Sequence, residues 1–293
     1  MRITQQMLHQ SSVRQMHQNL NRFNQISQQV STGKLLQRPS DDPFGVSKSM
    51  NLKSTLAANE QYERNTTNAS LWLDETDQVI KQTVNVLHRA RELAVQGNTG
   101  TLSDSDRAAI AEEVEHLTDQ IRQFANTKVN GKYLFNGQKT NQPPYPEQDS
   151  YQINSFDTGA VAFAVSDSLS IKVNVTADKL FGTADDETNL FKTLTNVTTS
   201  LRSGESVPLE EMEKGLNRIL TSWAEVGAVA ERVESIANRL KDSNLQLTSM
   251  LSKVEDVDYA EAITKLKSEE SIYQASLSVT SKIIQSSLVD FIR

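Results

Sequence analysis

Cysteine is absent from this chain of 293 residues. Its absence excludes disulfide bonds, iron–sulfur clusters and catalysis by a thiol. Long apolar runs are absent too: no stretch of about 18 apolar residues occurs, so we expect no membrane span. The opening residues, MRITQQMLHQ, contain no apolar core of a signal peptide. We therefore expect no Sec-type signal sequence.

Motifs of known enzyme chemistry are also missing. The sequence has no glycine-rich nucleotide loop, no dinucleotide fingerprint and no paired-histidine zinc motif. Glu113 and His116, with Glu112 beside them, resemble one half of a di-iron site in a helical bundle, but the second half is absent. A solvated helix face is the simpler interpretation. We predict that the chain is not an enzyme and has no catalytic, cofactor or metal site; a metal-dependent helical enzyme is the alternative.

Acidic residues are missing from the first 32 positions, which carry three arginines and many Gln, Asn and Ser residues. The whole chain nevertheless has a net charge of −7, from 30 basic and 37 acidic residues. This balance argues against a nucleic-acid partner, because binding needs basic side chains that displace phosphate counterions. Apolar residues make up 37 % of the chain, which is low for a globular domain and favours an elongated molecule.

Apolar residues recur in steps of three and four along most of the chain, which predicts a mainly α fold of long helices packed as coiled coils. Gly33 is suited to end the first helix, because glycine accepts positive φ without strain. The apolar seam of this helix consists of Val13, Met16, Leu20, Phe23 and Val30.

The stretch RPSDDP, residues 38–43, interrupts the helical pattern. Pro39 cannot continue a helix, whereas Asp42 is a good N-cap and Pro43 fits the first helical position. These features predict a short link between two helices. The link residues are Gly33, Pro39, Ser40, Asp41, Asp42 and Pro43.

The next helix is expected over residues 43–96, and another begins at Ser103, where Asp106 completes a capping box. Asn130 and Gly131, between apolar residues, signal a β-hairpin. The following part of the chain differs in kind. It contains the proline-rich run NQPPYPEQ, two strand-like segments, AVAFAV and LSIKVNV, and the short helical pattern ETNLFKTLTNVTTSLRSG. We predict a small β-rich (α+β) inserted domain.

The helical seam returns near Leu209 and continues to Val254, with Asn244 as its polar member. Asp258 and Glu261 match a capping box at the start of a last helix. The apolar seam of that helix consists of Ile263, Leu266, Tyr273, Leu277, Ile284 and Phe291.

The first 32 and the final 20 residues carry few charges. A helix of about 30 residues with an interrupted seam is marginal in water. Each buried Leu or Phe adds about 1.5–3 kcal/mol, and only where a partner covers it. We therefore expect the two terminal seams to form an assembly interface that becomes ordered with other subunits. An ordinary bundle within one chain is the alternative.

Four stretches resemble the bacterial flagellin superfamily and follow one another in that family's order. They are RPSDDPFGVSKSM, GKYLFNGQKTNQPPY, EDVDYAEAITKL and YQASLSVTSKIIQSSLVDFI. The two-proline form of the first is similar to the version in hook–filament junction members. The resemblance covers both ends and both helical segments, whereas residues 150–205 match no recognised pattern.

The resemblance implies an elongated, flagellin-like bundle of three domains. Residues 1–40 with 258–293 would pair as an inner coiled-coil domain, and residues 41–137 with 208–257 would form a helical-bundle domain. Residues 138–207 would be a variable β-rich outer domain. Residues 33–43 would link the inner and middle layers.

The resemblance also implies a secreted, extracellular structural component of the flagellum without a cofactor. Such a protein is exported unfolded by the flagellar type III apparatus, with an export chaperone before assembly. Its copies form a closed ring of about eleven subunits on a preceding hook-associated junction protein. Flagellin polymerises on that ring. A filament-forming flagellin and a cytosolic coiled-coil scaffold are the alternatives.

Overall fold

The computed structural model describes residues 2–99, 102–146 and 156–292, and the side chains of residues 2–6, 8, 9 and 283–292 lie outside the description. The chain forms two compact units. The terminal unit is Met1–Ala58 with Ser243–Arg293, and the central unit is Asn59–Asp242. Within the described ranges, no helix is long and apolar enough to cross a membrane.

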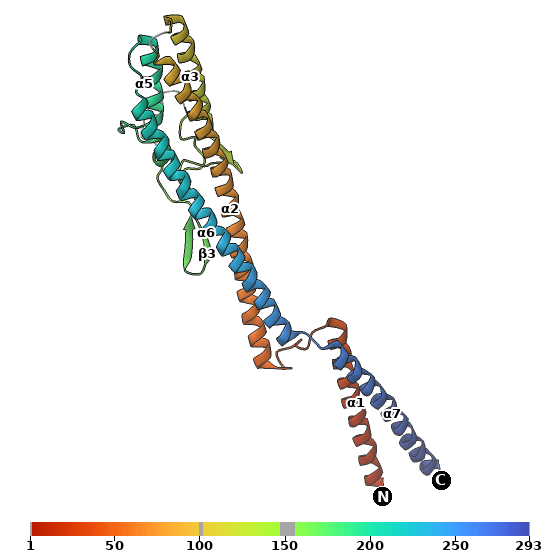
Figure 1. The fold of residues 1–293 in the computed structure, drawn as a ribbon. Helices are drawn as coiled ribbons and strands as arrows, with labels where there is room; N and C mark the ends of the chain where they lie inside the picture. Colours follow the sequence, from red (N-terminus) through yellow and green to blue (C-terminus); the bar gives the residue numbers. More distant parts are fainter. Residues whose placement is uncertain (1, 100–101, 147–155, 293) are drawn as a thin grey trace. The chain divides into compact units, whose positions relative to one another are not determined.

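The terminal unit contains α1 (Arg2–Thr32), α7 (Tyr259–Ile292), the start of α2 (Pro43–Gly97) and the end of α6 (Leu209–Glu255). α1 and α7 pack side by side and antiparallel, so that the chain begins and ends at the same end of the pair (Figure 1). The rings of Phe23 and Tyr273 stack across the pair, 6.2 Å apart. The predicted pairing of the terminal segments is confirmed.

In the central unit, the remaining parts of α2 and α6 run antiparallel (Figure 1). Trp223 Nε1 of α6 donates to Asp77 Oδ1 of α2 at 2.6 Å, and Arg91 forms an ion pair with Glu213. α3 (Asp104–Ala125) packs against α5 (Leu190–Ser203). The shorter elements are β1 (Lys128–Val129), β2 (Lys132–Tyr133), β3 (Ala162–Ser166), β4 (Leu169–Lys172) and α4 (Ala177–Phe181).

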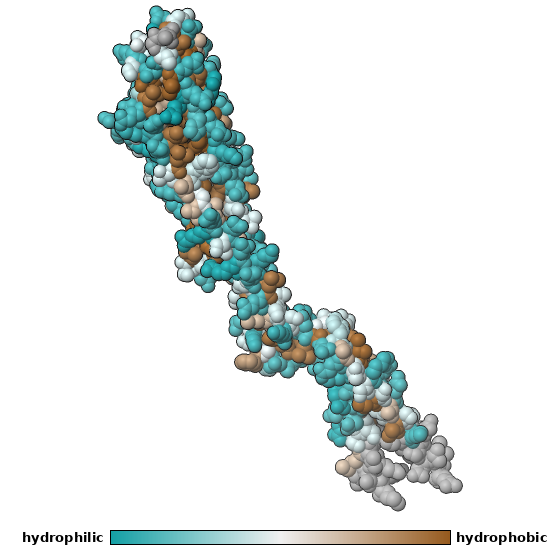
Figure 2. All heavy atoms as spheres, viewed as in Figure 1, coloured by the Kyte–Doolittle hydropathy of each residue, from teal (hydrophilic) through white to brown (hydrophobic). Residues whose placement is uncertain are grey.

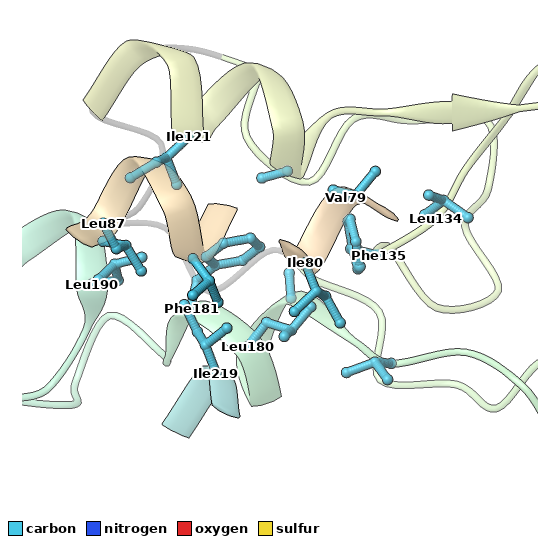
Figure 3. Packing of buried hydrophobic residues seen from close by; sticks show 14 of the residues in the cluster. Val79, Ile80, Leu87, Ile121, Leu134, Phe135, Leu180, Phe181, Leu190 and Ile219 are labelled. Atoms are coloured by element: carbon cyan, nitrogen blue, oxygen red, sulfur yellow. The ribbon is translucent and has the colours of Figure 1, made fainter. Parts of the chain in front are cut away.

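The core of the central unit follows the seven-residue repeat of α2. Leu73, Ile80 and Leu87 are all buried and lie one seven-residue repeat apart. Ile219 of α6 and Ile121 of α3 face this stripe (Figure 3). Thr76 and Thr83, between the larger side chains, are buried as well, and each hydroxyl donates to the backbone carbonyl four residues earlier. Threonine is therefore tolerated in this stripe, because carbonyl groups of the same helix accept the hydrogen bonds of its buried hydroxyls.

The inserted segment packs on the same core through an aromatic cluster. Tyr145 lies against Phe156, Phe181 and Phe191, with ring centroids 4.6–5.8 Å apart. Phe181 belongs to α4, a helix that the sequence pattern did not predict. The predicted strands and the predicted short helix are confirmed as β3, β4 and α5. The three-domain division stays a prediction.

Both hairpins are antiparallel. Asn130 (φ 50°) and Gly131 (φ 78°) form the predicted turn between β1 and β2, with the positive φ angles of a type I′ turn. The hairpin of β3 and β4 is held on α2, where the Tyr62 hydroxyl donates to Asp167 Oδ1 at 2.5 Å and Asn65 Nδ2 donates to the Ala164 carbonyl at 2.8 Å. α2 thus provides the surface on which the insert is built.

Predicted helix caps are confirmed at several ends. Ser103 and Asp106 form the reciprocal capping box at the start of α3. Asp258 accepts from the backbone N–H of Ala260 and of Glu261 at the start of α7. The Glu261 carboxylate binds Lys265 instead of the backbone N–H of Asp258. The second capping box is therefore formed by its Asp258 half alone.

Candidate functional site

The residues of the predicted assembly interface lie in the terminal unit. Phe23 and Tyr273 pack on each other within one molecule, and the other described α1 seam residues are half-buried. Ile263 and Leu277 of α7 are 48 % and 42 % exposed. The side chains of Ile284 and Phe291 lie outside the described residues. The structure therefore pairs the two seams and leaves part of α7 in water.

Large apolar side chains are exposed throughout the terminal unit, which shows hydrophobic surface in Figure 2. Phe44, in the first turn of α2, is 80 % exposed. Patches of this kind mark interaction sites when they are extensive. The exposed set is Met7, Leu35, Phe44, Met50, Leu245, Met250, Tyr259, Ile263, Ile272, Leu277 and Val279. Of these exposed residues, the sequence analysis named Ile263 and Leu277 as part of the predicted interface.

The link starts at Gly33, whose φ of 70° ends α1 as predicted. A Cβ atom at this position would lie 2.6 Å from the Tyr259 hydroxyl, which would have to move aside, so the positive φ is the main reason for glycine here. The Val257 N–H donates to the Gly33 carbonyl at 3.0 Å, and the Leu35 N–H donates to the Glu255 carbonyl at 2.6 Å. The start of the link is thus bonded to the segment between α6 and α7.

The rest of the link is an exposed turn that leads into α2. The Arg38 N–H donates to Asp41 Oδ2 at 3.0 Å, and the Asp41 N–H donates back to the Arg38 carbonyl. Pro39 and Ser40 lie between them and are exposed. Asp42 Oδ1 accepts from the Phe44 N–H at 3.0 Å, which confirms its role as the N-cap before Pro43.

Glu255 is the residue of this region that sequence reasoning missed. Its side chain is only 8 % exposed, although it is ionised and stands at the end of α6. Lys53 of α2 donates to its Oε1 at 2.8 Å, Lys34 Nζ lies 3.4 Å from the same oxygen, and Ser49 donates to Oε2 at 3.3 Å. These partners are about 200 positions away in sequence. No local pattern could therefore have identified the cluster.

Two opposing effects act on the pKa of Glu255. Burial alone would raise the pKa, but the hydrogen bonds and positive charges of Lys53 and Lys34 outweigh burial and lower it. For Lys34, burial works toward a lower pKa, whereas Asp256 and Glu255 raise it above the ordinary lysine value. The cluster is therefore ionised around neutral pH, with both charges stabilised by their partners.

The half-motif Glu113–His116 is not completed by further ligand-type residues in the described part of the chain. Glu113 pairs with Arg89 at 2.9 Å across the α2–α3 contact. Within the described residues, no group of three His, Asp or Glu side chains is placed to hold a metal ion. Glu113 serves instead as a partner of the neighbouring helix.

Comparison with known proteins matches both helical parts of the chain. Residues 3–140 match the bacterial flagellin N-terminal helical region, and residues 209–292 match the bacterial flagellin C-terminal helical region. Flagellar hook-associated protein 3 of Escherichia coli K12 is 30 % identical over 303 residues, which cover 94 % of this chain and 95 % of the relative. Flagellin of Bacillus subtilis is 27 % identical, with 85 % of each chain covered.

The fold is shared with a solved member of the same group. The crystal structure of flagellar hook associated protein-3 from Legionella pneumophila superposes with a TM-score of 0.63 at 18 % identity, covering 70 % of this chain and 98 % of that chain. This likeness shows that the two chains share a fold over the matched part. The chain therefore belongs to the bacterial flagellin family and is a structural component of the bacterial flagellum, related within that family to hook-associated protein 3.

Proposed function

We propose that this chain is the subunit of a hook–filament junction and forms the platform on which flagellin polymerises. The observation that carries the proposal is the 30 % identity to flagellar hook-associated protein 3 over nearly the full length of both chains. The two-proline link RPSDDP between α1 and α2, which resembles the junction members of the family, supports the same assignment.

The assembly interface that we propose is the α1–α7 pair, whose seam residues are covered only in part within one molecule. Each terminal helix covers one side of the other, and Ile263 and Leu277 remain nearly half exposed. A neighbouring subunit that covered the exposed half of such a side chain would gain about 0.7–1.5 kcal/mol for each, roughly half the value for burying a fully exposed one. The proposed interface residues are Val13, Met16, Leu20, Phe23, Val30, Ile263, Leu266, Tyr273, Leu277, Ile284 and Phe291.

The proposed partners follow from a place at the junction. A closed ring of about eleven copies would stand on the preceding hook-associated junction protein and present its other side to flagellin. Before assembly, the chain would bind an export chaperone and pass through the flagellar type III apparatus. In the ring, residues 1–40 with 258–293 would form the inner layer, residues 41–137 with 208–257 the middle layer, and residues 138–207 the outer domain.

The link would absorb differences in packing between the hook side and the filament side. Its exposed turn at Pro39 and Ser40 supports this role, because movement there breaks few buried contacts. Pro39→Ala with Pro43→Ala would make the turn less restricted. We expect altered motility or filament shape in cells that carry both substitutions. Normal motility together with normal filament shape would count against a mechanical role.

A deletion strain tests the proposal directly. Without a junction subunit, hooks should still form, filaments should be missing, and flagellin monomer should accumulate in the culture medium. Complementation with the intact gene should restore filaments. Filaments of normal length on the deletion strain would contradict the proposal.

A filament-forming flagellin is the second candidate, favoured by the 27 % identity to Bacillus subtilis flagellin. The two candidates differ in how far the purified protein assembles. A flagellin extends filament seeds without limit, whereas a junction subunit should stop at a ring. Long filaments grown from the purified chain alone would favour the second candidate.

We also infer that the chain has no catalytic role. Glu113 of the one candidate metal motif pairs with Arg89, which supports this inference. Metal analysis of the purified protein should find no stoichiometric metal. A cytosolic scaffold is tested separately, since only an exported subunit should appear in the culture supernatant.

A further inference from the structure

The charge cluster around Glu255 joins segments that are far apart in sequence. Lys34 belongs to the start of the link, Lys53 and Ser49 belong to α2, and Glu255 ends α6. All four lie in the terminal unit. Burying the Glu255 carboxylate costs free energy unless cations and donors surround it. The contacts of the cluster therefore depend on one another.

The backbone reinforces the same contact. Lys34 and Asp256 form an isolated antiparallel bridge, and their side chains form an ion pair at 3.3 Å. The Leu35 N–H donates to the carbonyl of Glu255 itself. Glu255 therefore holds the link twice, through its backbone oxygen and through its carboxylate.

We propose that Glu255 is an electrostatic latch that holds the start of the link, residues 33–36, against α2 and the end of α6. Loss of its charge frees these residues while the α1–α7 pair and the central unit keep their structure. The aromatic stack of Phe23 on Tyr273 and the core around Ile80 do not involve the cluster. The latch is a property of the single chain and does not depend on the proposed junction role.

The latch should respond to acid and base only outside the neutral range. Because the folded pKa of Glu255 is lowered, the latch contributes fully above the ordinary glutamate pKa and is lost as the pH falls through the lowered value. Because the pKa of Lys34 is raised, its contribution is lost only as the pH rises through that raised value. The charged groups that face the carboxylate are Lys34 and Lys53, and Asp256 pairs with Lys34, so the latch stays closed around pH 7.

Glu255→Gln tests the latch with almost no change in side-chain volume. Hydrogen exchange of the full-length protein at neutral pH reports on the amides of Leu35 and Val257, whose hydrogen bonds close the link. We expect exchange there to become about tenfold faster, a factor that corresponds to about 1.4 kcal/mol. Glu261→Gln is the matched control, because Glu261 is exposed and pairs with Lys265 on one helix.

A second variant and a second probe separate the latch from a general loss of stability. Lys53→Met removes one cation and keeps Glu255, and it should speed exchange at the same two amides by a smaller factor. The chain has no cysteine, so a spin label on Ser40→Cys is unambiguous and should become more mobile in Glu255→Gln. Unchanged exchange and label mobility in Glu255→Gln would overturn the proposal. Faster exchange throughout residues 59–242 would overturn it as well.

Discussion

The two units of this chain share one sequence pattern and bury it to different extents. In the described residues of the central unit, the apolar seams of α2, α3 and α6 close into a core. Among the described side chains of the terminal unit, Ala262 is the only buried hydrophobic one. Apart from Gly45, the other buried residues described there are polar, namely Asn19, Ser49, Glu255 and Thr280. The terminal unit is therefore held by pairing and charge rather than by a core.

α6 shows the difference within one helix. Its seam residues Ile219, Val226 and Val233 are buried in the central unit. Farther along, Leu247 and Leu251 keep the same spacing but are half-buried, and Leu245 beside them is 65 % exposed. Periodicity thus shows which side of a helix is apolar, whereas burial depends on how many neighbours one chain supplies. The missing neighbours of the terminal unit are, on our account, other subunits.

The largest expected contrast is between two substitutions that each shorten an apolar seam residue to alanine, one in each unit. Ile80→Ala removes a fully buried side chain and should lower the free energy of unfolding of the central unit by about 2–5 kcal/mol. Leu266→Ala, in the half-buried seam of α7, should leave that transition unchanged. Both tryptophans, Trp72 and Trp223, lie in the central unit, so urea unfolding followed by fluorescence reports on it. Equal losses in the two variants would remove the distinction between the units.

A second contrast concerns two glycines at turns of the central unit. Gly137 has φ 53°, and a Cβ there would lie 2.1 Å from the Asp157 carbonyl oxygen. Gly131 has φ 78° and open space around it. Gly131→Ala should cost about 1–2 kcal/mol in backbone strain alone, and Gly137→Ala should cost clearly more. Thermal unfolding of both variants measures the difference, and an equal cost would show that the Asp157 segment moves aside.

Helix caps give a smaller effect that again separates the units. Ser103→Ala removes the capping box of α3 and should lower central-unit stability by about 1 kcal/mol. Asp258→Ala removes the cap of α7 and should reduce helix content in circular dichroism without shifting the tryptophan transition. Ser235→Ala, on the exposed face of α6, is the neutral control. A shift of the tryptophan transition in Asp258→Ala would mean that the units unfold together.

The smallest prediction has the opposite sign. Gly227 lies within α6, is exposed, and has no atom within 4 Å of the place of a Cβ. Gly227→Ala should stabilise the central unit by about 0.5–1 kcal/mol, because alanine loses less backbone freedom in a helix. Urea unfolding measures the gain. Destabilisation instead would indicate a contact at this face that the isolated chain does not show.

Much of the fold could be predicted from local signals. The end of α1 at Gly33, the N-caps Asp42 and Ser103, and the turn at Asn130–Gly131 each depend on a few neighbouring residues, and all are confirmed. The apolar seams of the long helices could also be predicted, because the spacing of their apolar residues repeats over many turns. Local chemistry therefore determined where the elements begin and end.

Features that depend on distant contacts could not be predicted. α4 is five residues long and is stabilised by the cluster in which Phe181 meets Tyr145 and Phe191, so its own sequence carries little helical signal. Glu255 stands in the run EDVD, where nothing distinguishes it from its acidic neighbours. Its low exposure arises from lysines brought in by other segments.

Hydrogen exchange of the isolated monomer, resolved by peptide and compared with assembled protein, tests the central claim most directly. We predict strong protection of residues 69–94 and 212–240 in both states. Residues 2–32 and 259–292 should exchange markedly faster than these in the monomer and become strongly protected after assembly. Equal protection of the terminal and central helices in the monomer would contradict the claim that the terminal unit obtains its missing neighbours from other subunits.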